Sequence, residues 1–167
     1  MLERILYVSR AATGTELSDI SEIAQAARLR NAAGGVLGGL SGGLVFIDGW
    51  IVQALEGPAP ALCATYTRIL KDPRHVQISL RARERIYYRQ FGAPGLILRS
   101  GPSISPAILA RFDYHFGFPV EGFPADALLE FMAETCRPAL PAASGAAQGA
   151  APGAVPGAVP VEIRRAP

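Results

Sequence analysis

A chain of 167 residues, half of them apolar, can bury one sizeable core and still carry an appendage. The net charge is only +2, and no basic block could neutralise a row of phosphates, so nucleic acid is excluded as a default partner. The sequence has neither a leader-like apolar segment nor a window of about 18 uncharged apolar residues, and we expect a cytoplasmic protein with no membrane contact. Cys63 and Cys136 form no motif and are expected to be free thiols.

The first half of the chain predicts three strands and a helix. Residues 2–9 form a β-rich run. Residues 15–31 have an apolar stripe, with acidic side chains early and basic ones late, which is typical of a helix. A glycine-rich stretch, 34–43, enters a strand ending at Ile47, and Asp48-Gly49 fits a hairpin turn to a partner strand at 50–56.

The second half predicts a helix, one or two strands and two short helices. The helix at 58–71 ends before Asp72-Pro73, because a residue before proline avoids the helical region. Residues 76–86 alternate as a half-exposed strand, with Val76, Ile78, Leu80 and Ala82 on one side. A last strand is expected at 91–98, where Pro94 suits only an edge or a bulge. Short helices at 108–112 and 124–135 are expected to cover the other sheet face or to carry an output.

The element order is β-α-β-β-α-β followed by one short strand. This order predicts an α+β, ferredoxin-like fold with two helices on one sheet face and two C-terminal helices. We expect a ligand-binding domain at 1–100, a helical extension at 101–137 and an Ala/Gly/Pro-rich tail at 138–167. The tail has too few large side chains to offset chain entropy and is expected to be disordered. Its basic pair, Arg164-Arg165, is either solvated or a partner contact.

Catalytic patterns are scarce. His75 and His115 are too isolated to form a metal site, and no Ser/His/Asp arrangement is legible. The glycine-rich stretch lacks the Gly-Lys-Ser/Thr ending of a phosphate loop, so a softened loop and strand entry is favoured.

Gln53 and Tyr7 are the two residues that a purely structural interpretation explains least well. Strand alternation places Gln53 on the same face as Ile51 and Leu55, so it is expected to be buried. A buried amide without partners costs about 1–3 kcal/mol, so Gln53 is either satisfied within the core or contacts a ligand. Strands one and three are neighbours in the predicted order, which allows Tyr7 and Gln53 to meet on one sheet face.

The chain resembles the BLUF (blue light using flavin) family over about residues 1–100. The resemblance rests on four short motifs in the family's order, which are Tyr7-Val8-Ser9, Arg30-Asn31, Gln53-Ala54-Leu55-Glu56-Gly57 and Asp72-Pro73-Arg74-His75. Each motif is weak alone, and their shared order makes the set fairly specific.

The resemblance implies a blue-light photoreceptor whose FAD ring lies between the two helices. Tyr7 would donate an electron and a proton, Gln53 would bridge tyrosine and flavin, and Asn31 would bind the ring. The cofactor set implied by the motifs also includes Ser9, Arg30, Arg74 and His75. Such a protein is not an enzyme, and we expect it to signal to an unidentified partner protein as a homo-oligomer.

Two other functions remain open. One is a flavin-free BLUF-like interaction scaffold. The other is a small acyl-phosphate hydrolase on a ferredoxin-like fold, which would need an arginine cradle and a positioned asparagine that the sequence does not reveal.

The sequence departs from the family pattern in two places. The family's Gly-Ile/Val-Thr-Gly strand aligns either with residues 35–38 or with 40–42, because four residues are nearly duplicated, and the threonine is lost or replaced by Ser41. The last strand has Phe91, Pro94 and Leu96 where the family often has Phe-x-x-Trp-x-Met, and Trp50 is no replacement. We therefore expect photochemistry to survive while signal transmission differs.

Overall fold

The computed structural model describes residues 1–115 and 120–138. The elements in chain order are β1 (Leu2–Ala11), α1 (Leu17–Ala33), α2 (Gly35–Gly38), β2 (Ser41–Ile47), β3 (Trp50–Pro58), α3 (Ala59–Ile69), β4 (His75–Ile86), β5 (Ile97–Ser100), a 3-10 turn (Gly101–Ser103), α4 (Pro106–Arg111), a second 3-10 turn (Val120–Gly122) and α5 (Ala125–Thr135). The tail expected at 138–167 lies, apart from Pro138, outside the described residues.

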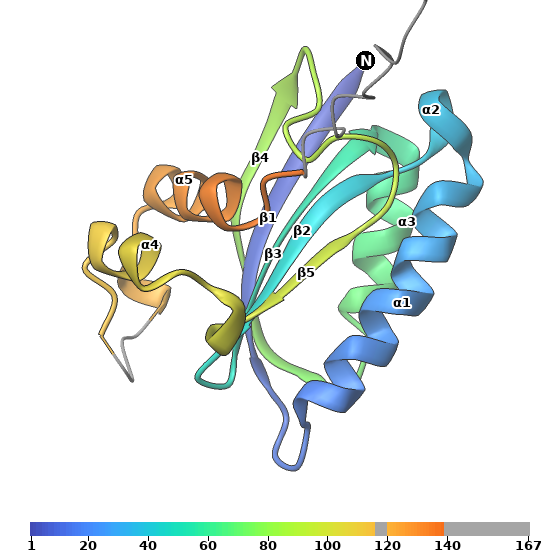
Figure 1. The fold of residues 1–167 in the computed structure, drawn as a ribbon. Coiled ribbons are helices and arrows are strands. Elements are labelled where there is room, and N and C mark those ends of the chain that lie inside the picture. Colours follow the sequence, from blue (N-terminus) through green and yellow to red (C-terminus); the bar gives the residue numbers. More distant parts are fainter. Residues whose placement is uncertain (116–119, 139–167) are drawn as a thin grey trace, which may run out of the picture.

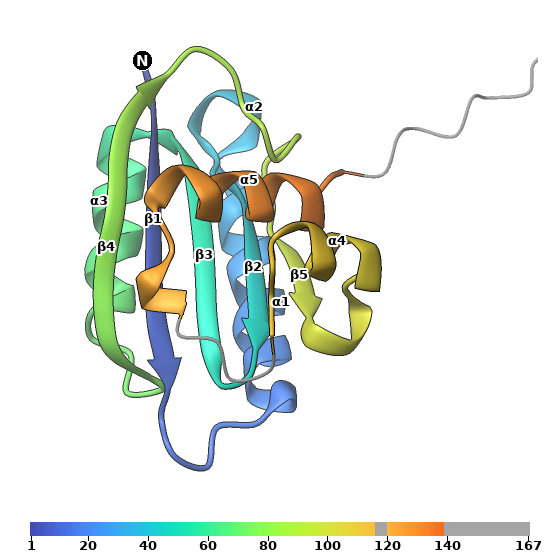
Figure 2. The same ribbon diagram turned by 90° about the vertical axis from the view of Figure 1, so that its left-hand side faces the viewer.

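The strands form one sheet in the order β4-β1-β3-β2-β5. The β1–β3, β1–β4 and β2–β3 pairs are antiparallel, and β5 adds to β2 in parallel. Helices α1 and α3 cover one face, while α4 and α5 lie on the other (Figures 1 and 2). The α+β, ferredoxin-like prediction is confirmed. Of the two alternatives for the late helices, the structure shows them covering the second sheet face.

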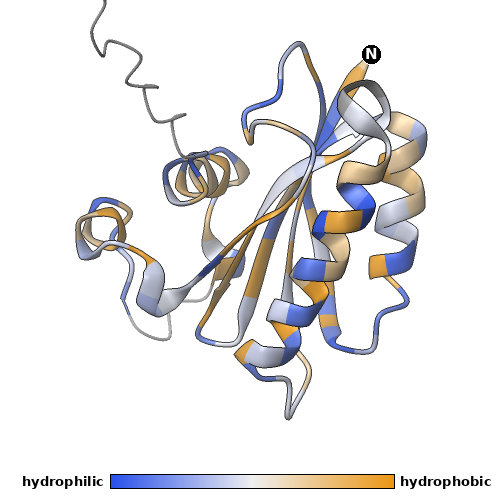
Figure 3. Ribbon diagram, turned by 45° about the vertical axis from the view of Figure 1, so that its right-hand side comes forward, coloured by the Kyte–Doolittle hydropathy of each residue, from blue (hydrophilic) through white to orange (hydrophobic). Residues whose placement is uncertain are grey.

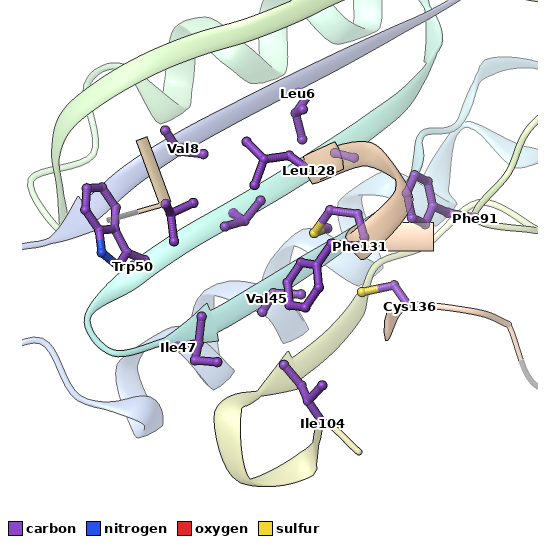
Figure 4. Close-up of a cluster of buried hydrophobic side chains, with 14 residues drawn as sticks. Leu6, Val8, Val45, Ile47, Trp50, Phe91, Ile104, Leu128, Phe131 and Cys136 are labelled. Carbon is purple, nitrogen blue, oxygen red and sulfur yellow. The ribbon is translucent and has the colours of Figure 1, made fainter. Parts of the chain in front are cut away.

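Strand alternation divides the apolar residues between two cores. Leu6, Val8 and Val52 point toward α5, where Leu128, Phe131 and Met132 close over them (Figure 4). The opposite cluster lies under α1 and α3 and includes the buried residues Ile5, Ile20, Leu44, Ile51, Leu55 and Leu62. Polar and apolar residues intermix along α1 (Figure 3), and the buried residues Ile20, Ala24 and Asn31 mark the side that packs on the sheet. No helix among the described residues is long and apolar enough to cross a bilayer.

Part of the glycine-rich segment forms an additional helical turn before β2. Residues 35–38 form α2, and β2 begins at Ser41. The family strand motif is therefore matched by 40–42, and the four-residue near-duplication is absorbed before the strand. Gly43 faces the end of α5, because a Cβ there would lie 2.7 Å from Cys136 Sγ. Both cysteines are free, with Cys136 buried in this contact.

The predicted position of the last strand, 91–98, is wrong, because β5 spans Ile97–Ser100. Only Ile97–Ser100 pairs with β2, and Pro94 lies in the irregular segment before it. A proline cannot donate a ladder hydrogen bond, so pairing begins beyond it.

The one-sided apolar alternation expected along 76–86 is also wrong. Val76 and Leu80 are 41% and 46% exposed, although the strand itself spans His75–Ile86. The β1–β4 register shifts at two places, and Gln77 has a positive φ of 53°. Each irregularity adds a residue on one strand and moves the following side chains to the other face.

Candidate functional site

Tyr7 and Gln53 face each other across the β1–β3 pair. They are direct partners in the strand register, and the Tyr7 hydroxyl donates a hydrogen bond to Gln53 Oε1. The two residues are 0% and 5% exposed. The buried amide thus has a core partner at one end, and the position of both residues on one sheet face is as the sequence predicts.

The Tyr7 phenol is held in its neutral form. Burial raises the pKa of Tyr7 well above its usual value, and the negative forms of Tyr66 and Asp72 would raise it further. The Tyr66 ring lies 5.7 Å from the Tyr7 ring, between centroids. Burial therefore favours the neutral phenol, which can donate the hydrogen bond to Gln53.

A cavity of about 270 Å³ lies between α1 and α3, beside Gln53. It is lined by Ile23, Ala27, Arg30, Asn31, Gln53, Leu55, Thr65, Arg68, Ile69, Asp72, Arg74 and His75. Apolar groups from both helices and β3 form its walls, and two side-chain amides and several charged groups interrupt them. Tyr7 is not among the residues that line the cavity, and its hydroxyl is linked to it through Gln53.

Asn31 is 4% exposed at the end of α1 that faces the cavity. Its side-chain Nδ2 donates a long hydrogen bond of 3.4 Å to the Gly95 carbonyl. The backbone carbonyl of Asn31 accepts from Leu40 N at 3.0 Å. Asn31 therefore lines the cavity despite the added turn α2, and its side chain contacts the segment before β5.

His75 and Ser9 form a pair at the start of β4. Ser9 Oγ lies 2.9 Å from His75 Nδ1, and only the histidine lines the cavity. Burial lowers the pKa of His75, which favours a neutral ring. Ser9 is thus placed to orient His75, while His75 itself faces the cavity.

Three guanidinium groups and one carboxylate line the cavity. Arg74 binds Asp72 through two bonds, Nε to Oδ1 at 2.9 Å and Nη2 to Oδ2 at 2.7 Å. This pair lowers the pKa of Asp72. Arg30 and Arg68 line the cavity from α1 and α3, so the lining carries excess positive charge.

Four residues that line the cavity were not predicted from the sequence, namely Arg68, Thr65 and the apolar Ile23 and Ile69. Thr65, Arg68 and Ile69 follow i, i+3, i+4 spacing on α3, which indicates one helix face. That spacing could have found them once Gln53 had identified the opposing sheet face.

Glu56 of the Gln-x-Leu-Glu-Gly motif faces away from the cavity and is fully buried. Oε1 accepts from Arg4 Nη2 at 2.8 Å, and Oε2 accepts from the backbone N–H groups of Gln90 and Phe91 at 2.8 and 3.2 Å. Arg89 reinforces the link by donating to the Glu56 and Gly39 carbonyls. The strand that carries Gln53 therefore anchors the chain between β4 and β5.

The chain is similar to known light-responsive proteins. A family model described as sensors of blue-light using FAD matches residues 2–95, more than half of the chain. The photoactivated adenylate cyclase subunit beta of Euglena gracilis is 34% identical over 90 residues, which are 52% of this chain and 10% of that protein. The same subunit of Euglena longa is 35% identical over 77 residues, or 46% and 8% of the two chains. The chain spans only about a tenth of these relatives.

Solved structures give the same assignment. The dark-state structure of BlrB, a BLUF protein, is 30% identical, covers 67% of this chain and 83% of that chain, and has a TM-score of 0.57. The photo-activated state of BlsA has a TM-score of 0.70 over 83% of this chain and 96% of that chain, and its 23% identity supports the fold. The family consists of sensors, which supports a binding module over the acyl-phosphate hydrolase. The chain belongs to the BLUF family of blue-light sensors that use a flavin.

Proposed function

We propose that the cavity between α1 and α3 holds the ring of FAD and that Tyr7 and Gln53 form its light-responsive hydrogen-bond pair. The observation that carries the proposal is the Tyr7–Gln53 contact beside a cavity whose other amide is Asn31. An apolar slot with a few fixed polar groups suits a flat heteroaromatic ring. When bound, the flavin absorbs blue light and becomes an oxidant in its excited state.

The charged groups of the cavity favour FAD over a flavin without phosphate. Arg30, Arg68 and Arg74 meet one carboxylate, Asp72, within the lining. Arg74 is engaged by that carboxylate, which leaves Arg30 and Arg68 for an anion. Guanidinium groups match phosphate oxygens in charge and in hydrogen-bond geometry.

Gln53 can change state without moving a charge. Its Oε1 accepts from Tyr7, so its Nε2 is the end available to the cavity. A rotated amide, or its tautomer, would exchange donor and acceptor toward both neighbours. Tyr7 would supply an electron and a proton and recover both, and its raised pKa returns it to the neutral phenol.

The signal would pass to a partner protein in the cytoplasm, with the chain acting as a homo-oligomer. We propose a flavin-binding domain at 1–100, a helical extension at 101–137 and a tail at 138–167. Asn31 contacts the segment before β5, and Glu56 holds the same segment from the other face, so this segment is well placed to transmit a change.

Absorption spectroscopy of the purified protein in darkness tests the proposal. We expect a yellow protein, a small red shift of the flavin band after blue light, and FAD on chromatography of the released cofactor. Gln53→Leu should keep the flavin and lose the red shift. Gln90→Leu, on an exposed side chain, is the matched control and should behave as the parent protein. A colourless protein that takes up no FAD would instead favour the flavin-free scaffold.

A further inference from the structure

A second and larger cavity, of about 730 Å³, lies on the other side of α1. Its walls come from α1, from the segment 93–95 with β5, and from the chain just after α5. No lining residue is shared with the cavity beside Gln53. The volume is in the usual range for sites that bind small molecules, which is about 300–1,000 Å³.

Three arginines from three different elements line this second cavity. They are Arg28 of α1, Arg99 of β5 and Arg137, two residues beyond α5, and the described lining contains no acidic residue. Within residues 1–115 and 120–138, no carboxylate forms an ion pair with Arg28 or Arg99. Arg137 lies 3.5 Å from Glu134, whose carboxylate is also 3.1 Å from Arg111. The cavity is therefore cationic, and Glu134, which does not line it, offsets only the charge of Arg137.

The cavity offers neutral and apolar groups beside its arginines, of which Arg28 and Arg137 are exposed to solvent. Ser21 and Gln25 add neutral hydrogen-bonding groups from α1, while Pro94 and Leu96 supply an apolar wall. A Cβ at Gly95 would lie 3.9 Å from Arg28 Cγ, so the Arg28 stem runs beside this segment. Cationic, neutral polar and apolar groups thus converge on one space.

The exposed edge of β5 is poorly suited to a peptide that adds as a strand. Leu98 O accepts from Arg99 Nη1 at 3.1 Å. Ser103 Oγ occupies both backbone groups of Ser100, at 2.9 and 2.8 Å. Strand addition depends on free backbone groups along the edge, so we expect side chains rather than this edge to provide the recognition.

We propose that this cavity binds a phosphate-bearing small molecule of nucleotide size. The arginines would hold the phosphate oxygens through paired N–H donors, and the apolar wall would take the uncharged part. The site is separate from the flavin cavity, and its occupancy does not depend on the function proposed above.

Isothermal titration calorimetry of the full chain, with its flavin and in darkness, tests the site with ADP as the probe. We expect saturable binding at one site, binding of inorganic pyrophosphate, and none of adenosine. Arg28→Gln and Arg99→Gln should each weaken ADP binding about tenfold, because each removes a charged hydrogen-bond donor. Arg85→Gln, an exposed residue of β4, is the matched control and should bind ADP as the parent does.

Three results would overturn the proposal. The first is the lack of saturable heat with ADP and with pyrophosphate up to about 10 mM. The second is unchanged ADP affinity in both cavity variants. The third is that Arg68→Gln loses ADP binding while Arg28→Gln binds ADP as the parent does. That result would place the nucleotide in the flavin cavity. If the chain takes up no flavin, the proposed photoreceptor function is contradicted. The ADP titration would still test the second cavity in that case.

Discussion

The hydroxyl of Tyr7 is the group on which the proposed photochemistry depends. Tyr7→Phe keeps the ring in the core but removes the donor to Gln53 Oε1. We expect retained flavin, no red shift, and a fall of about 1–3 kcal/mol in the free energy of unfolding, because a buried acceptor loses its partner. Difference absorption and urea unfolding measure the two effects. Tyr66→Phe, on the neighbouring ring, is the control, and a normal red shift in Tyr7→Phe would contradict the assignment.

His75 makes stability depend on pH. Burial lowers the pKa of His75 in the folded state, so near its unfolded pKa of about 6.5 the unfolded chain binds more protons. The free energy of unfolding should therefore fall as pH drops from about 7 to about 5. Asp72, whose folded pKa is also lowered, loses its contribution only below about pH 4.

Urea unfolding across this range checks the pH prediction. His75→Gln should flatten the decline between about pH 7 and 5, while His115→Gln, on an exposed side chain, should leave it in place. Equal slopes in the parent and in His75→Gln would show that another group causes the decline.

At the scale of elements, Glu56 holds β3 to the chain before β5. Glu56→Gln keeps the shape and removes the charge that Arg4 and two backbone N–H groups share. We expect a loss of about 3 kcal/mol, since a buried ion pair is broken and Arg4 keeps only the exposed Glu84 as its ion-pair partner among the described residues. Glu84→Gln removes the exposed partner of the same Arg4 and should cost less than about 1 kcal/mol. Similar losses in both variants, measured by urea unfolding, would contradict a special role for Glu56.

The contact between β2 and the end of α5 depends on Gly43. A Cβ at this position would lie 2.7 Å from both Cβ and Sγ of Cys136, so Gly43→Ala must push α5 outward. We expect about 1–3 kcal/mol of destabilisation from this overpacking. Gly38→Ala meets nothing within 4 Å and should be neutral or slightly stabilising. Thermal unfolding distinguishes the two, and a neutral Gly43→Ala would mean that α5 is loosely packed.

Periodicity predicted the elements whose patterns are local and missed those set by tertiary contacts. The Tyr7–Gln53 pairing follows from strand order and alternation, both of which are legible in the sequence. The shifted faces of β4 could not be predicted, because a bulge leaves no periodic trace. The position of Ser9 behind His75 and the role of Glu56 depend on which chain segments pack beside them, and spacing along one strand does not contain that information.

The whole molecule has three layers, and the two faces of the sheet have different tasks. The face under α1 and α3 carries the cavity beside Gln53, while α4 and α5 bury an apolar cluster on the other (Figures 1 and 4). Polar contacts at the rim assist this docking, since Arg81 donates to the Glu121 and Phe123 carbonyls at 2.7 Å and the Tyr114 hydroxyl donates to Asp48. Residues 1–100 are therefore expected to need the segment that follows.

Truncation tests this dependence at the scale of the whole chain. A chain ending at Pro138 keeps α5 and should retain the stability and flavin spectrum of the parent. A chain ending at Ser100 would expose Leu6, Val8 and Val52 to water, and such an apolar patch favours aggregation. We expect the shorter chain to be much less soluble and to bind a hydrophobic dye, with size-exclusion chromatography as the measurement. If it were instead monomeric with normal flavin uptake, residues 1–100 would fold without the helices that follow, and these helices would be a removable element.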